Sequence, residues 1–211
     1  MTEETGEAWA DRLDRLAEAV FGGALGRARA APLLAEHDAI VGRIVATDEH
    51  CELLRSARVD WALCEATPAG AAPGESWAYR AATGRIPGLA PLEEHRALAG
   101  SIAGVFEVLT GPWLRERLRG VVVALADPVD HALLVDEGLR LWLTRIVVVD
   151  GRARLCRRPI PLPEEIAPLL DRVRERRLDP SLDLRPLYRA CLELGRPPRR
   201  RARDVFAAAL A

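Results

Sequence analysis

The sequence predicts an α+β protein, with a small antiparallel sheet centred on a hairpin at 139–158, packed helices, and a mostly helical N-terminal part. Three observations lead to this prediction. Strand-forming residues flank Asp150-Gly151, a dipeptide that suits the tight turn of a hairpin. Apolar side chains recur at helical spacing over residues 7–22. Residues 121–125 (VVVAL) form an apolar run that is typical of a buried strand.

The N-terminal region, residues 1–104, is expected to be mostly helical. Gly22-Gly23 ends the first helix, Pro32 suits the first turn of a second, and Thr47-Asp48 can cap a third. Further along, apolar and polar side chains alternate twice, which favours short strands. The elements expected here are helices at 7–22, 32–44 and 47–54, strands at 59–63 and 77–81, and loops at 67–75 and 84–90.

Residues 105–211 are expected to form the α+β region, a division that leaves open one continuous domain. The apolar stripe Leu98, Ile102, Val105 and Leu109 predicts a helix that crosses this boundary. The elements expected from there on are helices at 91–109, 113–119, 127–135, 163–176 and 187–194, strands at 121–125 and in the hairpin, and an extended segment at 159–163.

A two-residue turn at Asp150-Gly151 sets the register of the hairpin and therefore its two faces. One face is mainly aliphatic and the other carries several arginines. Because an arginine fork binds carboxylates and phosphates in bidentate fashion, Arg145, Arg154 and Arg158 are the candidate ligand-binding residues. The alternative is a face that is solvated, or covered by a helix, with arginine stems lying over apolar surface. The expected pairs are Val149 with Arg152, Val148 with Ala153, Val147 with Arg154, Ile146 with Leu155, Arg145 with Cys156, Thr144 with Arg157, and Leu143 with Arg158.

Composition limits the classes of function. The chain is 49% hydrophobic and 29% charged, which is typical of a folded globular protein. A net charge of -1 does not favour nucleic acid as a partner, and no apolar run is long enough to span a membrane. The acidic start of the chain is unlike a secretory signal, so a cytoplasmic location is expected. All 30 basic residues are arginines, so a single arginine carries less information than usual.

No motif points to a metal, a cofactor or a catalytic residue. The four cysteines form no CxxC pair, and they are read as small, mostly buried apolar side chains. Three acid–histidine dipeptides lack the spacing that would place both groups on one helical face. They are Glu36-His37, Glu49-His50 and Glu94-His95. No serine lies in a GxSxG elbow, and there is no Walker loop. No metal or cofactor is therefore expected.

Three stretches give the C-terminal half a resemblance to a known family. They are Leu109-Thr110-Gly111 with Leu114 and Leu118, the strand and turn from Thr144 to Gly151, and Leu187–Gly195 followed by Arg203-Asp204-Val205. This order resembles the chorismate lyase-like superfamily, which includes chorismate pyruvate-lyases and the effector-binding (UTRA) domains of transcription regulators. The resemblance implies that Arg145 binds the carboxylate or phosphate of a ligand, and it matches no catalytic carboxylate in this chain.

Two hypotheses of function follow. The first is binding of a small anionic metabolite in a pocket between sheet and helices, with lyase activity left open. The alternative is a non-enzymatic protein–protein interaction or assembly module, including a homo-oligomer. A deep pocket beside the hairpin with converging arginines would favour the first hypothesis. A flat apolar surface, with the arginines already paired to carboxylates, would favour the second.

Overall fold

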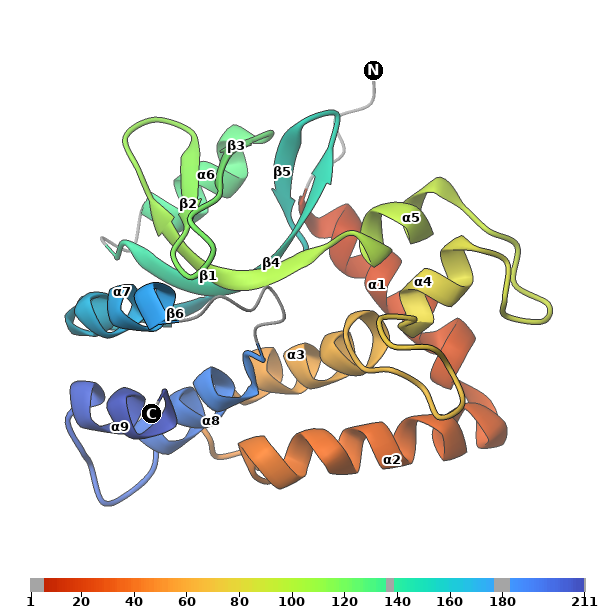
Figure 1. The fold of residues 1–211 in the computed structure, drawn as a ribbon, viewed down its shortest axis with the longest axis horizontal. Helices are drawn as coiled ribbons and strands as arrows, with labels where there is room; N and C mark the ends of the chain where they lie inside the picture. Colours follow the sequence, from red (N-terminus) through yellow and green to blue (C-terminus); the bar gives the residue numbers. More distant parts are fainter. Residues whose placement is uncertain (1–5, 136–138, 177–182, 211) are drawn as a thin grey trace.

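The computed structural model describes residues 6–135, 139–176 and 183–210. Its sheet closes into a small barrel, and helices from both ends of the chain pack around it (Figure 1). The predicted α+β class and the helical N-terminal part are confirmed. In the described part of the chain, no helix combines the length and the apolar character needed to cross a membrane.

In the described part of the chain, five helices precede the first strand, and a sixth lies between the third and fourth strands. The helices of the N-terminal part are α1 (Gly6–Phe21), α2 (Gly23–Val41), α3 (Cys51–Cys64), α4 (Trp77–Ala82) and α5 (Glu93–Ala99). The strands are β1 (Ile102–Val108), β2 (Trp113–Glu116), β3 (Val122–Leu125), β4 (Leu141–Val149), β5 (Arg152–Leu155) and β6 (Ile160–Leu162). The other helices are α6 (Pro128–Val135), the 3-10 helix η1 (Glu164–Ile166), α7 (Ala167–Arg176), α8 (Arg185–Leu194) and α9 (Ala202–Ala209).

The β4–β5 hairpin confirms the predicted turn and the register next to it. Asp150 and Gly151 both have positive φ values, 51° and 73°, as a two-residue hairpin turn of this type requires. The four expected pairs nearest the turn are all present, and beyond them the Cys156 amide donates to the Arg145 carbonyl at 2.9 Å. Farther out the prediction is wrong, because β5 ends at Leu155 and Leu143 pairs with Ile160 of β6 instead of Arg158. Thr144 and Arg157 are likewise not a ladder pair.

The barrel has a simple connectivity. Its strands are ordered β1-β2-β3-β5-β4, and pairing of β4 with β1 closes the ring, while β6 extends β4. The β3–β5 pair is parallel and the other pairs are antiparallel. With α6 between β3 and β4, this is the connectivity of the OB-fold, a five-stranded Greek-key barrel. A fold of this kind serves many functions, so the site must be argued from side chains.

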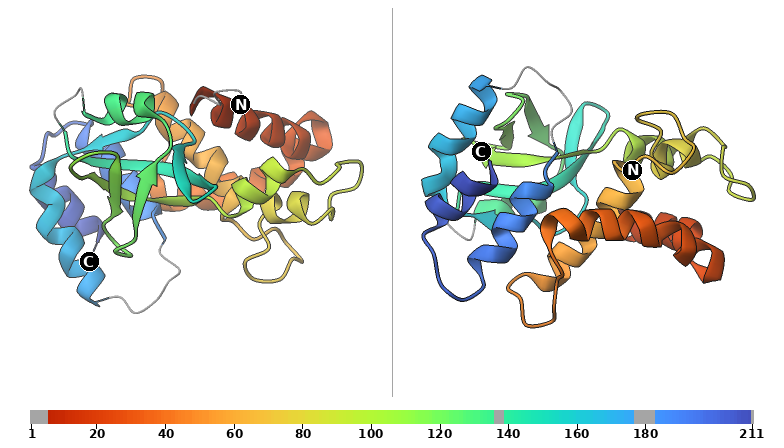
Figure 2. Two further views of the ribbon diagram at one scale, coloured as in Figure 1. Left: turned by 90° about the horizontal axis from the view of Figure 1, so that it is seen from above. Right: turned by 60° about the horizontal axis from the view of Figure 1, so that its bottom comes forward.

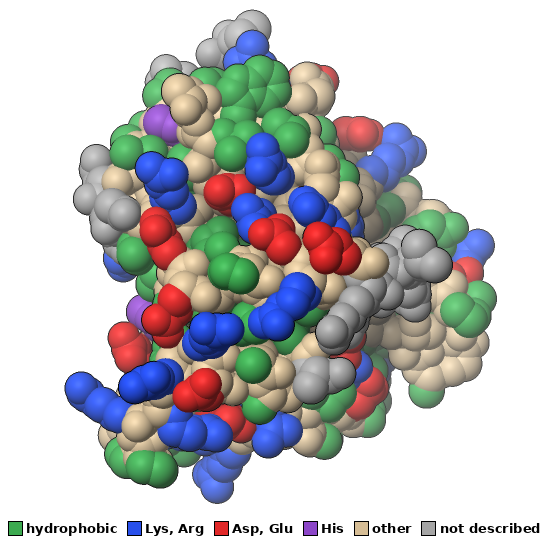
Figure 3. Space-filling model, turned by 60° about the vertical axis from the view of Figure 1, so that its left-hand side comes forward, with side chains coloured by type: hydrophobic (Ala, Val, Ile, Leu, Met, Phe, Trp, Pro, Cys, Tyr) green, Lys and Arg blue, Asp and Glu red, His purple; other side chains and the backbone are tan. Residues whose placement is uncertain are grey.

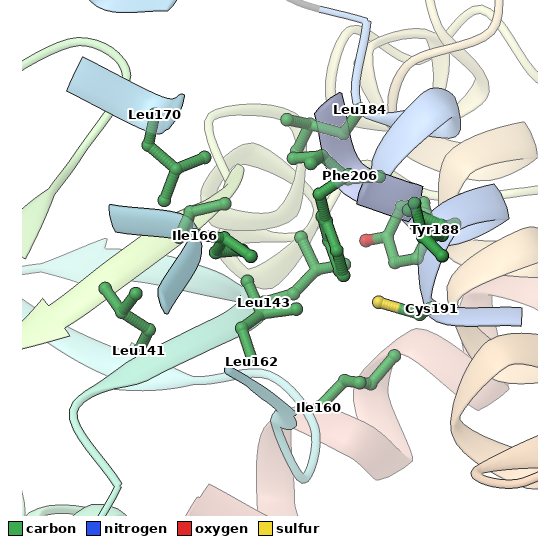
Figure 4. Packing of buried hydrophobic residues seen from close by; sticks show 14 of the residues in the cluster. Leu141, Leu143, Ile160, Leu162, Ile166, Leu170, Leu184, Tyr188, Cys191 and Phe206 are labelled. Atoms are coloured by element: carbon green, nitrogen blue, oxygen red, sulfur yellow. The ribbon is translucent and has the colours of Figure 1, made fainter. Parts of the chain in front are cut away.

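Apolar side chains fill the barrel and also cover most of its outside. Inward-facing residues of the strands, with Leu134 of α6, form the interior cluster. The outer side of β4 is covered as well, which explains why this strand reads as a continuous apolar run. Leu143 meets Tyr188 of α8 and Phe206 of α9 in a second cluster (Figure 4). A third cluster places Val147 against α1 and α5.

The two halves of the sequence share these clusters. Val41 of α2 and Leu54 of α3 pack in the same cluster as the C-terminal helices, and α2 lies beside α8. Figure 2 shows helices from both ends of the chain along the barrel. The expected division between residues 104 and 105 falls inside β1.

Several predicted elements are wrong, and local ambiguity explains them. The strands expected at 59–63 and 77–81 are helical, since they belong to α3 and α4. In α4 the Ser76 hydroxyl caps the helix by accepting from the Tyr79 amide at 3.3 Å. The helix expected at 91–109 is α5 followed by β1, and the one expected at 113–119 contains β2 instead.

Helix lengths also differ from the prediction. The second helix begins at Gly23, nine residues before the expected start, and carries Pro32 inside it. A further helix, α9, begins at Ala202 within the basic segment 196–203. Val205 and Phe206 of α9 are buried, and the burial of these two side chains packs the helix against the rest of the protein.

Candidate functional site

A cavity of about 700 Å³ lies where α3 ends and where β1 and α8 begin. We name it the α3–β1–α8 cavity. Its volume is in the range of sites for small metabolites. Side chains from separate parts of the chain line it, and those used below are Glu36, Trp61, Cys64, Glu65, Ser101 and Arg119, with Asp183 and Arg185 at the start of α8.

Arg119 is positioned by the turn between β2 and β3. The buried Glu116 carboxylate accepts from the Val105 amide at 3.3 Å and from the backbone amide of Arg119, so it fixes the turn. The Arg119 Nη1 donates to the Ala103 carbonyl at 3.1 Å and lies 3.6 Å from the Glu116 carboxylate. No described residue accepts a hydrogen bond from its Nε or Nη2. Arg119 therefore brings unused donors to the cavity.

Arg185 also lines the cavity, and its guanidinium makes more contacts than that of Arg119. Its guanidinium lies 4.4 Å from the centre of the Trp61 ring, in a cation–π contact. Its Nε donates to Asp183 at 3.0 Å and its Nη1 donates to Glu36 at 2.7 Å. These contacts hold the start of α8 against α2 and α3.

Arg145, the first of the predicted ligand-binding residues, is buried behind the cavity. Its Nη1 donates to the Ser101 hydroxyl at 2.8 Å, and its Nη2 donates to Glu65. Only 5% of its side chain is exposed, so both ends of the fork are enclosed by protein. The pair joins β4 to the end of α3 and the start of β1. Both Nη groups of Arg145 are therefore already bonded to other side chains of the protein.

The structure brings Arg145 and Arg158 together but not Arg154. Arg145 and Arg158 line a cavity of about 30 Å³, which has room for a water and not for a metabolite. Arg154 lies on β5 opposite Val147 and lines neither this cavity nor the α3–β1–α8 cavity. The three candidates therefore do not share the larger cavity.

A second, partly buried arginine reinforces the same junction. Arg157 donates from Nε and Nη2 to Asp60 of α3 at 2.8 and 3.0 Å, and from Nη2 to Asp14 of α1 at 2.6 Å. Asp60 is buried. Arginines at 145 and 157 thus both tie the barrel to the N-terminal helices. On the arginine face of the hairpin, Arg145 is buried, as the covered alternative expects, whereas Arg152 and Arg158 are exposed.

The polar side chains next to Arg145 do not form an activated nucleophile. Burial raises the pKa of the Cys64 thiol to about 11, so the thiol is neutral near pH 7. The Ser101 hydroxyl donates its proton to the Leu98 carbonyl at 2.6 Å, so this hydroxyl is not paired with a general base. Among the described residues, no group of three or more histidine, cysteine or acidic side chains could hold a metal ion.

His37, beside the cavity wall, predicts a pH dependence of stability. It is buried against Trp61 and Tyr188, its Nδ1 lies 3.7 Å from the Asp38 carboxylate, and no described residue forms a hydrogen bond with its ring nitrogens. Burial lowers the pKa of His37 from 6.5 to about 4. Between these values the unfolded chain binds more protons, so stability falls as the pH drops, by about 3 kcal/mol in total. The loss begins near pH 6.5 and is complete near pH 4.

Urea denaturation at several pH values between 7 and 4 tests this. His37→Leu removes the titrating group and is expected to flatten this part of the stability curve while keeping the stability at pH 7 within about 1 kcal/mol of the wild type. A variant that keeps the wild-type dependence would show that other groups cause it.

Exposed apolar side chains occur on β2, on β3 and on α6. We name this set the barrel patch: Trp113, Val121 and Val122 around β2 and β3, and Val129, Leu133 and Val135 on α6. Val129 is 68% exposed. In Figure 3 hydrophobic side chains gather near the top of the view, while arginines and carboxylates alternate below them. That alternation gives this face no extended region of one charge.

Sequence reasoning missed Arg119, Glu65 and Arg185 as site residues. Glu65 follows a segment predicted as a strand, and Arg119 lies in a segment predicted as a helix. The predicted elements therefore gave no reason to place either residue in the site. Gly120, whose φ is 76°, was the one local signal of a turn beside Arg119.

Comparisons with known proteins add no relative: no family model matches the chain, and no curated protein or solved structure matches it significantly. The resemblance to the chorismate lyase-like superfamily stays a prediction.

Proposed function

We propose that the protein binds a small metabolite with a carboxylate or phosphate group in the α3–β1–α8 cavity, and that Arg119 contacts this acid group. This keeps the ligand class expected from the sequence but changes the anchoring residue. Arg145 is assigned a structural role, because its two Nη groups already donate to Glu65 and Ser101. Catalytic residues remain unassigned.

The observation that carries the proposal is the state of the Arg119 side chain. It lines a cavity of suitable volume, is about one-third exposed, and offers Nε and Nη2 without a described acceptor. These two nitrogens form one edge of the guanidinium fork, the edge that binds a carboxylate or phosphate through two parallel hydrogen bonds. Its remaining contacts, to Ala103 and Glu116, hold the group in place, so less freedom is lost on binding.

A thermal-shift screen against small aromatic acids, aliphatic acids and sugar phosphates tests this function. A ligand that binds only the folded protein raises its melting temperature by mass action. Arg119→Met is expected to abolish the shift, and Arg119→Lys to reduce it. Arg115→Met is the matched control, because Arg115 is on β2, outside the cavity, 3.6 Å from Glu107. An equal shift in the Arg119 and Arg115 variants would contradict the proposal.

The barrel patch supports a second function, self-association. Helix α6 is apolar on both sides: Leu134 faces the barrel interior, and Val129 and Leu133 face outward. Apolar surface of this kind is usually covered. Because the patch is apolar, the same patch on a second copy, related by a twofold axis, would be a complementary cover.

Sedimentation velocity over a range of concentrations tests self-association. The wild type is expected to form dimers, and Val129→Asp is expected to be monomeric. Leu25→Asp is the control, since Leu25 is 77% exposed but lies on α2, away from the patch. A wild type that stays monomeric at all concentrations would contradict this second function.

A further inference from the structure

The α3–β1–α8 cavity carries charges of both signs. Among the described residues that line it, Glu36, Glu65 and Asp183 are acidic, and Arg119 and Arg185 are basic. Arg185 forms ion pairs with both Glu36 and Asp183. The lining therefore has one more negative than positive charge. A ligand with an acid group alone would match only one part of this surface, because charged sites favour ligands with the complementary pattern.

Glu65 keeps capacity to bind a ligand although it is paired with Arg145. Its Oε1 accepts from the Arg145 Nη2, and its side chain is 30% exposed. An ionised carboxylate has about four acceptor positions. No other described residue donates a hydrogen bond to Glu65. The remaining acceptor positions of Glu65, on a group that lines the cavity, suit an ammonium or another N–H donor.

Glu65 and Arg119 are both tied to the short segment at the start of β1. Arg145 bridges Glu65 to the Ser101 hydroxyl, and Arg119 donates to the carbonyl of Ala103. Ala103 is two positions after Ser101, and two steps of extended chain span roughly 7 Å. An acidic and a basic group therefore line the same cavity and are anchored to backbone positions that lie close together.

We infer that the ligand is a zwitterion, with its ammonium group at Glu65 and its carboxylate at Arg119. This inference rests on the proposed function and narrows it from acids in general to amino acids whose two charged groups are several bonds apart. Arg145 then has a further effect, because it fixes the Glu65 carboxylate through a charge-assisted hydrogen bond. Glu65 is positioned before the ligand arrives.

Calorimetric titration of the full chain with three matched sets of probes tests the inference. The zwitterions are γ-aminobutyrate and ε-aminocaproate. Butyrate and caproate carry the acid group alone, and butylamine and hexylamine carry the amine alone. At least one zwitterion is expected to bind the wild type about tenfold more tightly than either of its two single-charge counterparts.

Two variants assign the groups. Glu65→Gln keeps an oxygen that can accept from Arg145, and it is expected to bring the affinity for the zwitterion down to that for the carboxylate. Arg119→Met is expected to bring it down to that for the amine. Circular dichroism confirms that each variant is folded, and the comparison of probes on the wild type stands even if a variant is not.

The outcomes separate the inference from the proposed function. If caproate or butyrate binds as tightly as its zwitterion, the inference is overturned and the binding of acids at Arg119 stands. If no probe binds and the screen of acids also gives no shift, both are overturned. Tighter binding of the zwitterions that is unchanged in Glu65→Gln would also overturn the assignment of Glu65.

Discussion

Replacing Arg145 with alanine is expected to lower the free energy of unfolding by about 2–5 kcal/mol with no ligand present. The side chain is 5% exposed and joins Glu65 to Ser101 across three elements. Truncation opens a void in a packed region and removes both hydrogen bonds, while the Glu65 carboxylate, which is 30% exposed, can be hydrated. Urea denaturation measures the change.

Two further variants make the result specific. Arg145→Met keeps much of the apolar stem and is expected to lose less stability than alanine. Arg115→Ala removes an exposed arginine whose partner lies 3.6 Å away, and it is expected to cost less than about 1 kcal/mol. If Arg145→Ala proved no more damaging than Arg115→Ala, Arg145 would not be a structural tie, and its use as a ligand anchor would need to be considered again.

Gly104→Ala is expected to lower the free energy of unfolding by about 2–3 kcal/mol. A Cβ at this position would lie 2.8 Å from Oε1 and 2.9 Å from Cγ of Glu116. Glu116 is buried and accepts from the amides of Val105 and Arg119, so it cannot move aside without losing those hydrogen bonds. Since these bonds hold the turn that carries Arg119, ligand binding is expected to weaken as well.

Gly100→Ala is the matched control for Gly104→Ala. Gly100 has a φ of −90°, and its nearest neighbour to an added Cβ would be the Arg96 carbonyl oxygen at 3.6 Å, an ordinary contact. Its unfolding free energy is expected to change by less than about 1 kcal/mol. Equal effects of the two substitutions in urea denaturation would contradict the packing argument at Glu116.

The parts of the fold that were predictable have strong local signals. The turn at Asp150-Gly151 sets the register of the hairpin, because positive φ at two consecutive residues restricts the sequence strongly. Helix α1 follows from its regular apolar stripe. Helix α6 follows from Asp127, whose carboxylate accepts from the Val129 amide at 2.8 Å.

The elements that were mispredicted depend on contacts distant in sequence. Leu98 and Val105 have the spacing of one helical stripe, but they pack in different apolar clusters, one beside α1 and the other beside the C-terminal helices. The intervening Gly100 is the C-cap of α5. Periodicity cannot distinguish this arrangement from a single helix, because the register with β4 is set by tertiary pairing.

The candidate site was only half predictable for the same reason. The sequence identifies Arg145 as one of several arginines on a hairpin face, but its partner Glu65 is 80 residues away. Whether an arginine binds a ligand or another side chain is decided by such distant partners. Arg119 lacks any motif, and its part in the site follows from the barrel, which places Ala103 and Glu116 beside it.

The most direct test of the central claim is a crystal structure of the protein with the acid that gives the largest thermal shift. The account predicts that the acid oxygens lie in the α3–β1–α8 cavity, about 2.7–2.9 Å from Nε and Nη2 of Arg119, with the Arg145–Glu65 pair intact. An acid bound to Arg145 in place of Glu65, or bound outside the cavity, would contradict the account.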